Sequence, residues 1–306
     1  MPCTMQSQQY ESIIKAGQMP AAANDTFRQV TYLFRIHIIQ YKQIGRHYMS
    51  ELLRIDHISY TYHSLDGETL ALLDVSFEVH DGEFLGIVGP SGCGKSTLLS
   101  LIAGLLTPSS GSIYINGKDI KSSGKNIGYM LQKDHLLDWR NTLRNVTLGM
   151  EIQHKLSENS YIQINDLLNT YGLITFKNSF PSELSGGMRQ RAALIRTLLL
   201  EPDILLLDEP FSALDYQTRL EVADDIWGII RKEKKTAILI THDISEAISM
   251  SDRVIVMTKR PGTVKRIFDI KLSVPDRTPF TSRSAPEFKD YFNMIWKELN
   301  HNEQET

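Results

Sequence analysis

The residues best suited to chemistry form one glycine-rich loop that carries a lysine and two hydroxyl side chains. Residues 89–97 read Gly-Pro-Ser-Gly-Cys-Gly-Lys-Ser-Thr and fit the P-loop pattern, in which glycines let backbone N–H groups turn toward phosphate oxygens. We expect Lys95 to reach the β- and γ-phosphates of a nucleotide and Ser96 to hold Mg²⁺ through its hydroxyl. The predicted phosphate-binding residues are Gly89, Pro90, Ser91, Gly92, Cys93, Gly94, Lys95, Ser96 and Thr97.

Two consecutive carboxylates follow the most apolar stretch of the chain, Ile204-Leu205-Leu206-Leu207. The end of a strand is a rigid place to hold a carboxylate. Asp208 is therefore expected to orient the magnesium shell, and Glu209 to polarise an attacking water. Alone, the pair would equally suit an acidic junction between a strand and a turn, but beside a P-loop the catalytic interpretation is favoured.

A serine and two glycines open another predicted helix, which runs from Ser185 to Leu200 and stops before Pro202. Such a helix N-terminus is a second anion-binding site. One chain rarely needs two phosphate sites for one nucleotide. A dimer could use both head to tail, each copy lending Ser185, Gly186 and Gly187 to the P-loop of the other.

Buried strands and helices must position these side chains. Residues 83–88 read as a parallel strand before the P-loop, and residues 97–105 as a helix after it, closed by a glycine. Strands and helices then alternate, which indicates an α/β fold with a parallel sheet covered on both faces. Residues 52–61 and 70–79 predict two further strands joined by a turn, and residues 133–183 read as mainly helical.

The composition limits the classes of protein to which the chain can belong. The chain has 306 residues, of which 42% are hydrophobic and 23% charged, enough for a large buried core. A net charge of −3 gives no overall basic field, so we expect no nucleic-acid partner. Two cysteines, Cys3 and Cys93, are too few for a disulfide framework and suit a reducing cytosol. We find neither a membrane-spanning apolar stretch nor a secretory signal.

The two ends of the chain read as additions to a central domain at residues 49–265. Residues 1–48 form an N-terminal extension, interpreted either as a basic amphipathic segment for a membrane or partner, or as upstream sequence before a true start at Met49. Residues 266–306 form a short C-terminal extension. It contains a helix beginning near Pro286, with one apolar side made of Phe288, Phe292, Ile295, Trp296 and Leu299.

Taken together, these motifs resemble those of the ATP-binding cassette (ABC) ATPases over residues 50–265. Leu184 to Gly187 matches their signature loop, and Gln132 and His242 match their glutamine-loop and switch-histidine residues. The stretch 212–215 matches the loop that follows the acidic motif of the family, which corresponds here to Asp208-Glu209. Tyr62 lies where the family places an aromatic residue that stacks on adenine. Met188 stands where many members carry glutamine, so a γ-phosphate role for residue 188 is not expected.

The resemblance implies an α/β P-loop NTPase fold: an ABC-type nucleotide-binding domain with an antiparallel β subdomain and a helical insert at 133–184. It implies an ATPase that uses ATP and Mg²⁺. Catalysis would fall to Lys95, Gln132, Glu209 and His242. Magnesium would be held by Ser96, Gln132 and Asp208, and Tyr62, Ser185, Gly186, Gly187 and Asp215 would add to the nucleotide-binding P-loop.

Finer features resemble the nitrate, sulfonate and taurine importer group. They are residues 136–140, where Asp138 replaces a proline, and Lys259-Arg260-Pro261-Gly262. The resemblance implies the ATPase subunit of a bacterial uptake transporter for a small anion or a sulfonate-, nitrate- or taurine-like solute. It would be a homodimer at the cytoplasmic face of the membrane, under two permease subunits fed by a solute-binding protein. The alternatives are an export ATPase, or an ABC ATPase of translation or DNA repair.

Overall fold

The computed structural model describes residues 51–65, 67–121 and 127–300. The predicted N-terminal extension at residues 1–48, with both of its interpretations, therefore lies outside the described residues. In the part of the chain that is described, no helix is both long enough and apolar enough to cross a membrane.

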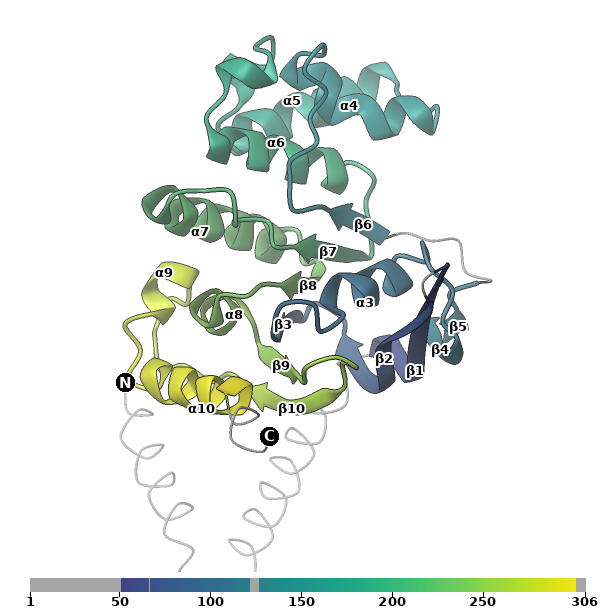
Figure 1. The fold of residues 1–306 in the computed structure, drawn as a ribbon. Coiled ribbons are helices and arrows are strands. Elements are labelled where there is room, and N and C mark those ends of the chain that lie inside the picture. Colours follow the sequence, from purple (N-terminus) through teal and green to yellow (C-terminus); the bar gives the residue numbers. More distant parts are fainter. Residues whose placement is uncertain (1–50, 66, 122–126, 301–306) are drawn as a thin grey trace, which may run out of the picture. The chain divides into compact units, whose positions relative to one another are not determined.

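A six-stranded sheet forms the centre of the domain, in the order β10-β9-β3-β8-β7-β6 (Figure 1). All neighbours are parallel except β9 and β10. The strands are β3 (Phe84–Val88), β6 (Ile127–Met130), β7 (Ile204–Asp208), β8 (Thr236–Ile240), β9 (Arg253–Met257) and β10 (Val264–Asp269). Strands β3 and β8 are wholly buried, as expected for parallel strands covered on both faces.

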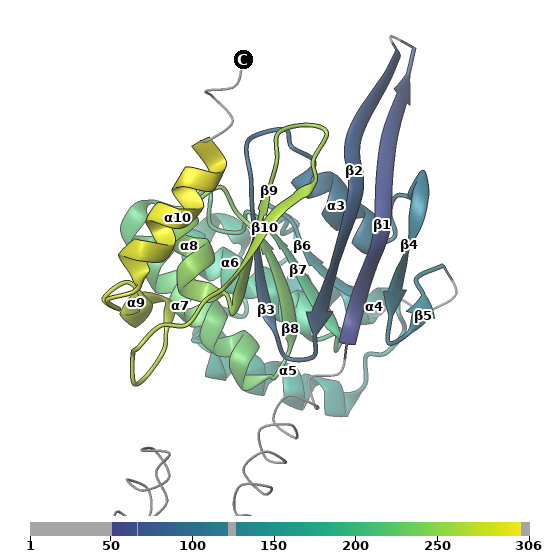
Figure 2. The ribbon, with the colours of Figure 1, turned by 90° about the horizontal axis from the view of Figure 1, so that it is seen from below.

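A second, antiparallel sheet lies beside the first and carries the predicted pair of strands. Its order is β2-β1-β4-β5, from β1 (Glu51–Ser64), β2 (Gly67–His80), β4 (Ser110–Ile115) and β5 (Lys118–Asp119). Helix α3 (Lys95–Ile102) shares one core with both sheets, because Leu98, Leu53 and Leu206 belong to a single buried cluster. Figure 2 shows β1 and β2 together on one side of the central sheet.

Helices cover the opposite face. They include α6 (Gly186–Leu198), α7 (Tyr216–Lys232) and α8 (Ile244–Met250). The segment predicted as helical contains α4 (Thr142–Ile152), α5 (Glu158–Thr170) and the short 3-10 helices η1 (Ile174–Phe176) and η2 (Pro181–Glu183). Leu205 and Leu207 of β7 pack in one cluster with Ile226 of α7 and Val146 of α4, so the helical insert shares the core of the sheet.

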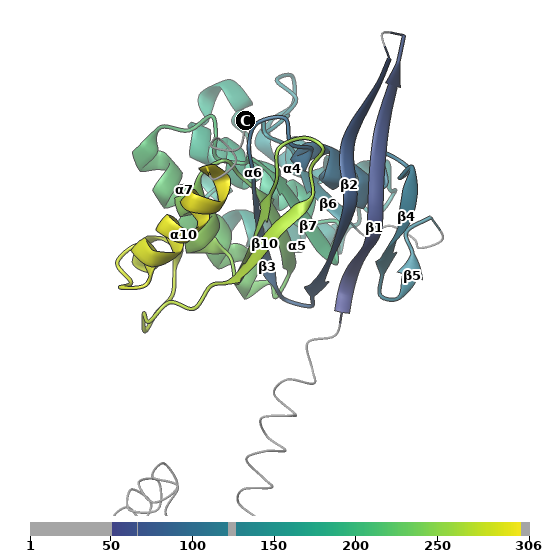
Figure 3. The same ribbon diagram turned by 60° about the horizontal axis from the view of Figure 1, so that its bottom comes forward.

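The C-terminal segment packs onto the same domain. Strand β10 crosses residue 265, so the predicted domain boundary falls inside an element. Helices α9 (Pro279–Ser282) and α10 (Phe288–Asn300) follow, and Figure 3 shows α10 on the side of the sheet away from β1 and β2. Ile295 is fully buried, but Trp296 is 55% exposed and stacks on Phe292 at 6.1 Å. Trp296 thus lies beside Phe292 on the predicted apolar side, but outside the part of that side that packs against the domain.

One tight loop, residues 258–263 between β9 and β10, fastens the two sheets to each other beside the P-loop. The Gly262 N–H donates to the Ala71 carbonyl at 2.9 Å, and the Gly262 carbonyl accepts from the Leu73 N–H at 3.0 Å. A Cβ added at Gly262 would overlap the carbonyl oxygen of Cys93. Glycine is therefore required there by the closeness of two backbones.

We predict that Gly262→Ala destabilises the domain by about 1–3 kcal/mol, because backbone must move to admit the methyl group. The measurement is the free energy of unfolding in urea. Gly228→Ala is the matched control: Gly228 lies exposed within α7 with no atom near an added Cβ, so alanine should stabilise the helix by about 0.5–1 kcal/mol. Equal stability of Gly262→Ala and the unaltered protein would contradict the proposed packing.

Candidate functional site

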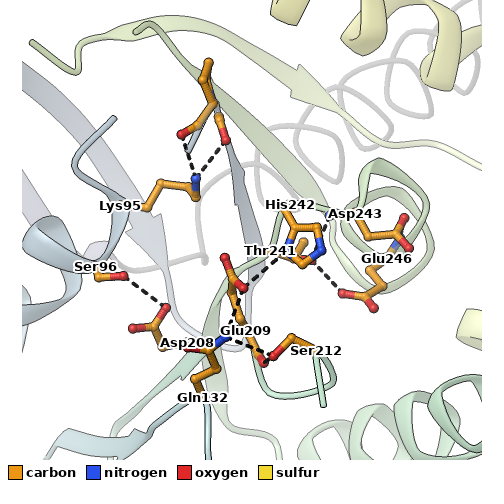
Figure 4. A network of polar contacts seen from close by, with 12 residues as sticks. Lys95, Ser96, Gln132, Asp208, Glu209, Ser212, Thr241, His242, Asp243 and Glu246 are labelled. Atoms are coloured by element: carbon orange, nitrogen blue, oxygen red, sulfur yellow. Dashed lines mark hydrogen bonds and ion pairs between the residues drawn. The ribbon is translucent and has the colours of Figure 1, made fainter. Parts of the chain in front are cut away.

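The P-loop joins the end of β3 to the start of α3, and two of its glycines adopt left-handed backbone angles. Gly92 has φ 73° and Gly94 has φ 103°, and a Cβ added at Gly94 would lie 2.7 Å from the Leu72 side chain. The buried Lys95 donates through Nζ to the carbonyls of Gly89 at 2.7 Å and Pro90 at 3.1 Å (Figure 4). The lysine thus lies within the curl of its own loop.

A hydroxyl and a carboxylate face each other at the predicted magnesium site. Ser96 Oγ, at the start of α3, lies 3.4 Å from Asp208 Oδ1 at the end of β7. Burial is the main reason that the pKa of Asp208 lies above its usual value, and the hydrogen bond from Ser96 partly opposes it. Both groups present the hard oxygen atoms that Mg²⁺ prefers, and Mg²⁺ typically needs only one or two protein ligands beside phosphate oxygens and water. The donor set fits that ion.

Tyr129 also contacts Asp208, although the sequence did not single it out. Its hydroxyl donates to Asp208 Oδ2 at 3.4 Å, and burial together with this carboxylate raises the pKa of Tyr129 to about 12. Tyr129 pairs with Leu206 across β6 and β7, so it stands beside the strand that ends in Asp208. The only signal in the sequence was its place in the strand before Gln132.

Glu209 is the centre of a polar network at the end of β7. Its backbone leaves the strand in a left-handed conformation with φ 45°, which is uncommon for a residue with a side chain. Its carboxylate then lies 3.2 Å from His242 Nδ1 and 3.5 Å from Gln132 Nε2 (Figure 4). Gln132 also donates to Ser212 Oγ at 3.2 Å. Three predicted catalytic side chains are thus brought together around one carboxylate oxygen.

Hydrogen bonds of the two residues on either side of His242 fix the loop that carries this histidine. Thr241 Oγ1 donates to Glu246 Oε2 at 2.6 Å, and Asp243 caps the N-terminus of α8 by accepting from two backbone N–H groups. Glu246 is buried, and that burial raises its pKa. These contacts position a loop whose histidine side chain remains 61% exposed.

An open pocket of about 610 Å³ lies over the P-loop, within the range of small-molecule sites. It is lined by Tyr62, Ala71, Ser91, Gly92, Gly94, Lys95, Ser96, Thr97, Glu209, His242 and Arg260. Seven of the fourteen predicted nucleotide-binding residues therefore line one cavity, whereas Gly89, Pro90 and Cys93 of the P-loop do not. Asp208 and Gln132 adjoin it through their contacts with Ser96 and Glu209.

The predicted signature residues do not line that pocket. Ser185 caps α6 by accepting from the Met188 N–H at 3.3 Å, and Gly187 packs so closely on Val222 that an added Cβ would lie at 2.7 Å. Asp215 likewise caps α7: its side chain accepts from Thr218 N–H at 3.1 Å, and this hydrogen bonding lowers the pKa of Asp215. In a single copy of the chain, Ser185, Gly187 and Asp215 therefore lie outside the pocket that the P-loop forms.

Tyr62 stands at the mouth of the pocket on β1. The residue is 42% exposed, its hydroxyl lies 3.1 Å from Thr97 Oγ1, and its ring meets that of Tyr60 edge to face with centroids 4.8 Å apart. An exposed aromatic ring held at the end of a phosphate-binding loop is suited to stacking on a planar base.

A sheet with a P-loop at its centre, an attached antiparallel sheet and a helical insert define the class as a P-loop ATPase cassette. Residues 72–212 match the family described as ABC transporter. The ABC transporter ATP-binding protein YtlC of Bacillus subtilis is 47% identical over 253 residues, covering 83% of this chain and 97% of that protein. The chain belongs to the ABC transporter ATP-binding proteins and is an ATPase of that family.

Other relatives carry the names of import proteins. The aliphatic sulfonates import ATP-binding protein SsuB of Bacillus licheniformis is 39% identical, covering 77% of this chain and 89% of that protein. The nitrate import ATP-binding protein NrtD of Synechocystis is 38% identical, covering 78% and 91%. Among solved structures, the dimeric ATP-binding cassette MJ0796 bound to ADP and phosphate matches with a TM-score of 0.62 at 29% identity, covering 72% of this chain and 99% of that one.

We predict that Tyr62→Ala weakens ATP binding by about 1–3 kcal/mol, because it removes the stacking ring, while turnover at saturating ATP changes little. Isothermal titration of ATP into the full chain measures the change. Tyr62→Phe keeps the ring and should retain most of the affinity. An unaltered Kd in Tyr62→Ala would exclude this residue and move the assignment to its neighbour, Tyr60.

Proposed function

We propose that this ATPase is the nucleotide-hydrolysing subunit of an uptake transporter for a small anion, of the sulfonate, nitrate or taurine kind. The support for import is the similarity to import ATP-binding proteins over most of their length. The subunit would work at the cytoplasmic face of the membrane, under two permease subunits that receive solute from a binding protein. Its ATPase domain would span residues 49–265, followed by a short C-terminal extension.

Within the pocket, each side chain takes a role that its position allows. Lys95 and the P-loop N–H groups would hold the phosphates, and Ser96, Asp208 and Gln132 would hold Mg²⁺, which supplies charge neutralisation to the phosphate oxygens. Glu209 would polarise the attacking water. His242, at 3.2 Å, would orient that carboxylate and the γ-phosphate end of the nucleotide.

The observation that carries the mechanism is the separation of two anion-binding elements in one chain. The P-loop lines the pocket, whereas Ser185, Gly186 and Gly187 do not. A head-to-tail homodimer resolves this separation, because each copy would present its α6 N-terminus to the nucleotide held by the other. ATP would then join the two copies, and hydrolysis would release them and drive the permease.

The permease would contact the helical insert near Trp139. This side chain is 76% exposed, in the segment that follows Gln132. Leu136, in the same segment, is only 8% exposed and belongs to the core cluster that the insert shares with the sheet. A buried anchor beside an exposed indole is a suitable arrangement for docking an apolar partner helix.

We predict that Glu209→Gln binds MgATP but hydrolyses it at least a hundredfold more slowly, because the amide keeps the shape and loses the basicity of the carboxylate. The two copies should then stay closed around ATP. Size-exclusion chromatography with light scattering, with and without MgATP, should show an ATP-dependent dimer.

Asp208→Asn is the matched control, one residue away. It should weaken Mg²⁺-dependent nucleotide binding and give no trapped dimer, because it alters the metal shell rather than the base. Hydrolysis at the unaltered rate by Glu209→Gln, or a monomer with ATP bound, would contradict the dimeric mechanism with Glu209 as base.

We also predict that Trp139→Glu separates ATP hydrolysis from transport. The isolated subunit should keep its ATPase activity, whereas co-purification with the permease and solute uptake should fall about tenfold or more. Leu105→Glu is the control, since Leu105 is similarly exposed, at 68%, but lies just after α3, outside the insert. Normal assembly and uptake with Trp139→Glu would place the permease contact elsewhere.

A further inference from the structure

Arg260 lines the nucleotide pocket without belonging to any motif that the proposed function uses. It comes from the stretch Lys259-Arg260-Pro261-Gly262, which the sequence singled out but to which no chemistry was assigned. Its guanidinium lies at the rim of the P-loop: Nη2 would be 3.5 Å from a Cβ added at Gly92.

The backbone that carries Arg260 is held in place by the protein itself. Gly262 exchanges two hydrogen bonds with Ala71 and Leu73 of β2, and Thr258 Oγ1 donates to the Pro261 carbonyl at 3.1 Å. Gly262 also packs against the backbone of Cys93. A fixed backbone at this position lowers the entropic cost of bringing the guanidinium to a ligand in the pocket.

The donors of Arg260 are uncommitted in the part of the chain that the structure describes. No ion pair or hydrogen bond there engages its guanidinium, and the side chain is exposed. The other arginine near this loop, Arg266, is by contrast paired with Glu298 at 2.9 Å. A guanidinium with free donors beside a phosphate-binding loop is suited to a charge-assisted, bidentate contact with a phosphate group.

The order of the strands decides which phosphate it faces. Glu209 and His242 follow β7 and β8, whereas Arg260 follows β9, and β3 with the P-loop lies between β8 and β9. Arg260 therefore stands across the P-loop from the groups proposed to act on the γ-phosphate. Its loop is instead bonded to β2, which pairs with the strand that carries Tyr62.

We propose that Arg260 is a nucleotide-binding residue that contacts the α- and β-phosphates of the bound nucleotide. This inference rests on the proposed assignment of the pocket to ATP. ATP, ADP and the transition state share these phosphates, so the contact stabilises all three alike. Arg260 thus contributes to affinity for the nucleotide and leaves the chemical step unchanged.

The test is the affinity of Arg260→Ala for ATP and for ADP, each titrated with Mg²⁺ into the full chain. Both Kd values should rise about tenfold, the loss expected for one charge-assisted contact, while kcat stays within twofold. Arg260→Lys should lose less. Lys259→Ala removes a neighbouring exposed charge that does not line the pocket, and its Kd values should be unchanged.

Each other outcome overturns the inference. Unchanged Kd values in Arg260→Ala exclude the contact, and loss of ATP but not ADP affinity places it at the γ-phosphate. An equal loss in Lys259→Ala indicates a general field effect. Weaker ATP-dependent dimerisation of Arg260→Ala in the Glu209→Gln background, with unchanged Kd, assigns the guanidinium to the second copy.

The failure of the proposed site is distinguishable from the failure of this inference. Lys95→Ala should abolish ATP binding if the pocket holds the phosphates, so normal binding by that variant rejects the site itself. Loss in Lys95→Ala with no change in Arg260→Ala rejects only the role of Arg260. Urea unfolding of Arg260→Ala should match the unaltered protein, because its exposed side chain makes no hydrogen bond or ion pair among the described residues.

Discussion

The close approach of three backbone segments is the constraint on which the rest of this site depends. The P-loop, strand β2 and the loop at residues 258–263 meet where Gly94 lies against the Ala71 carbonyl and the Leu72 side chain, and where Gly262 lies against the backbone of Cys93. Side chains at either glycine would push the segments apart. Because backbone takes part in each contact, the P-loop is held both to the antiparallel sheet that carries Tyr62 and to the loop after β9 that carries Arg260.

The order of the strands then determines which side chains lie around the P-loop. Parallel strands bring their carboxyl ends to one edge, so residues far apart in sequence meet there. Asp208 and Glu209 follow β7, and His242 follows β8. The left-handed backbone of Glu209 separates two adjacent carboxylates, sending Asp208 toward Ser96 and Glu209 toward His242. The backbone conformation of Glu209 thus lets one strand end present two carboxylates in different directions, as their proposed roles at the metal ion and at the attacking water require.

Much of this arrangement could be predicted from the sequence because it is local. A few consecutive residues are enough to recognise the P-loop, the strand before Asp208 and the hairpin at the start of the domain. Tyr129 and Arg260 could not be found in that way. Tyr129 meets Asp208 only because β6 neighbours β7, and Arg260 meets the P-loop only because the 258–263 loop packs on Cys93. Periodicity also leaves the depth of burial open, since Trp296 follows the fully buried Ile295 on the predicted apolar side of α10 and is nevertheless 55% exposed.

The electrostatics of the pocket support the proposed division of binding and chemistry between its two sides. Lys95 and Arg260 supply positive charge at the P-loop, whereas the carboxylates of Asp208 and Glu209 end β7 on the other side of β3. Burial already raises the pKa of Asp208, so a second unneutralised anion nearby would be costly without a cation. In the proposed mechanism, a triphosphate held from the basic side would approach these carboxylates with its charge partly compensated. Affinity would then be set by the loops after β3 and β9, while the ends of β7 and β8 would remain free to act on the terminal phosphate.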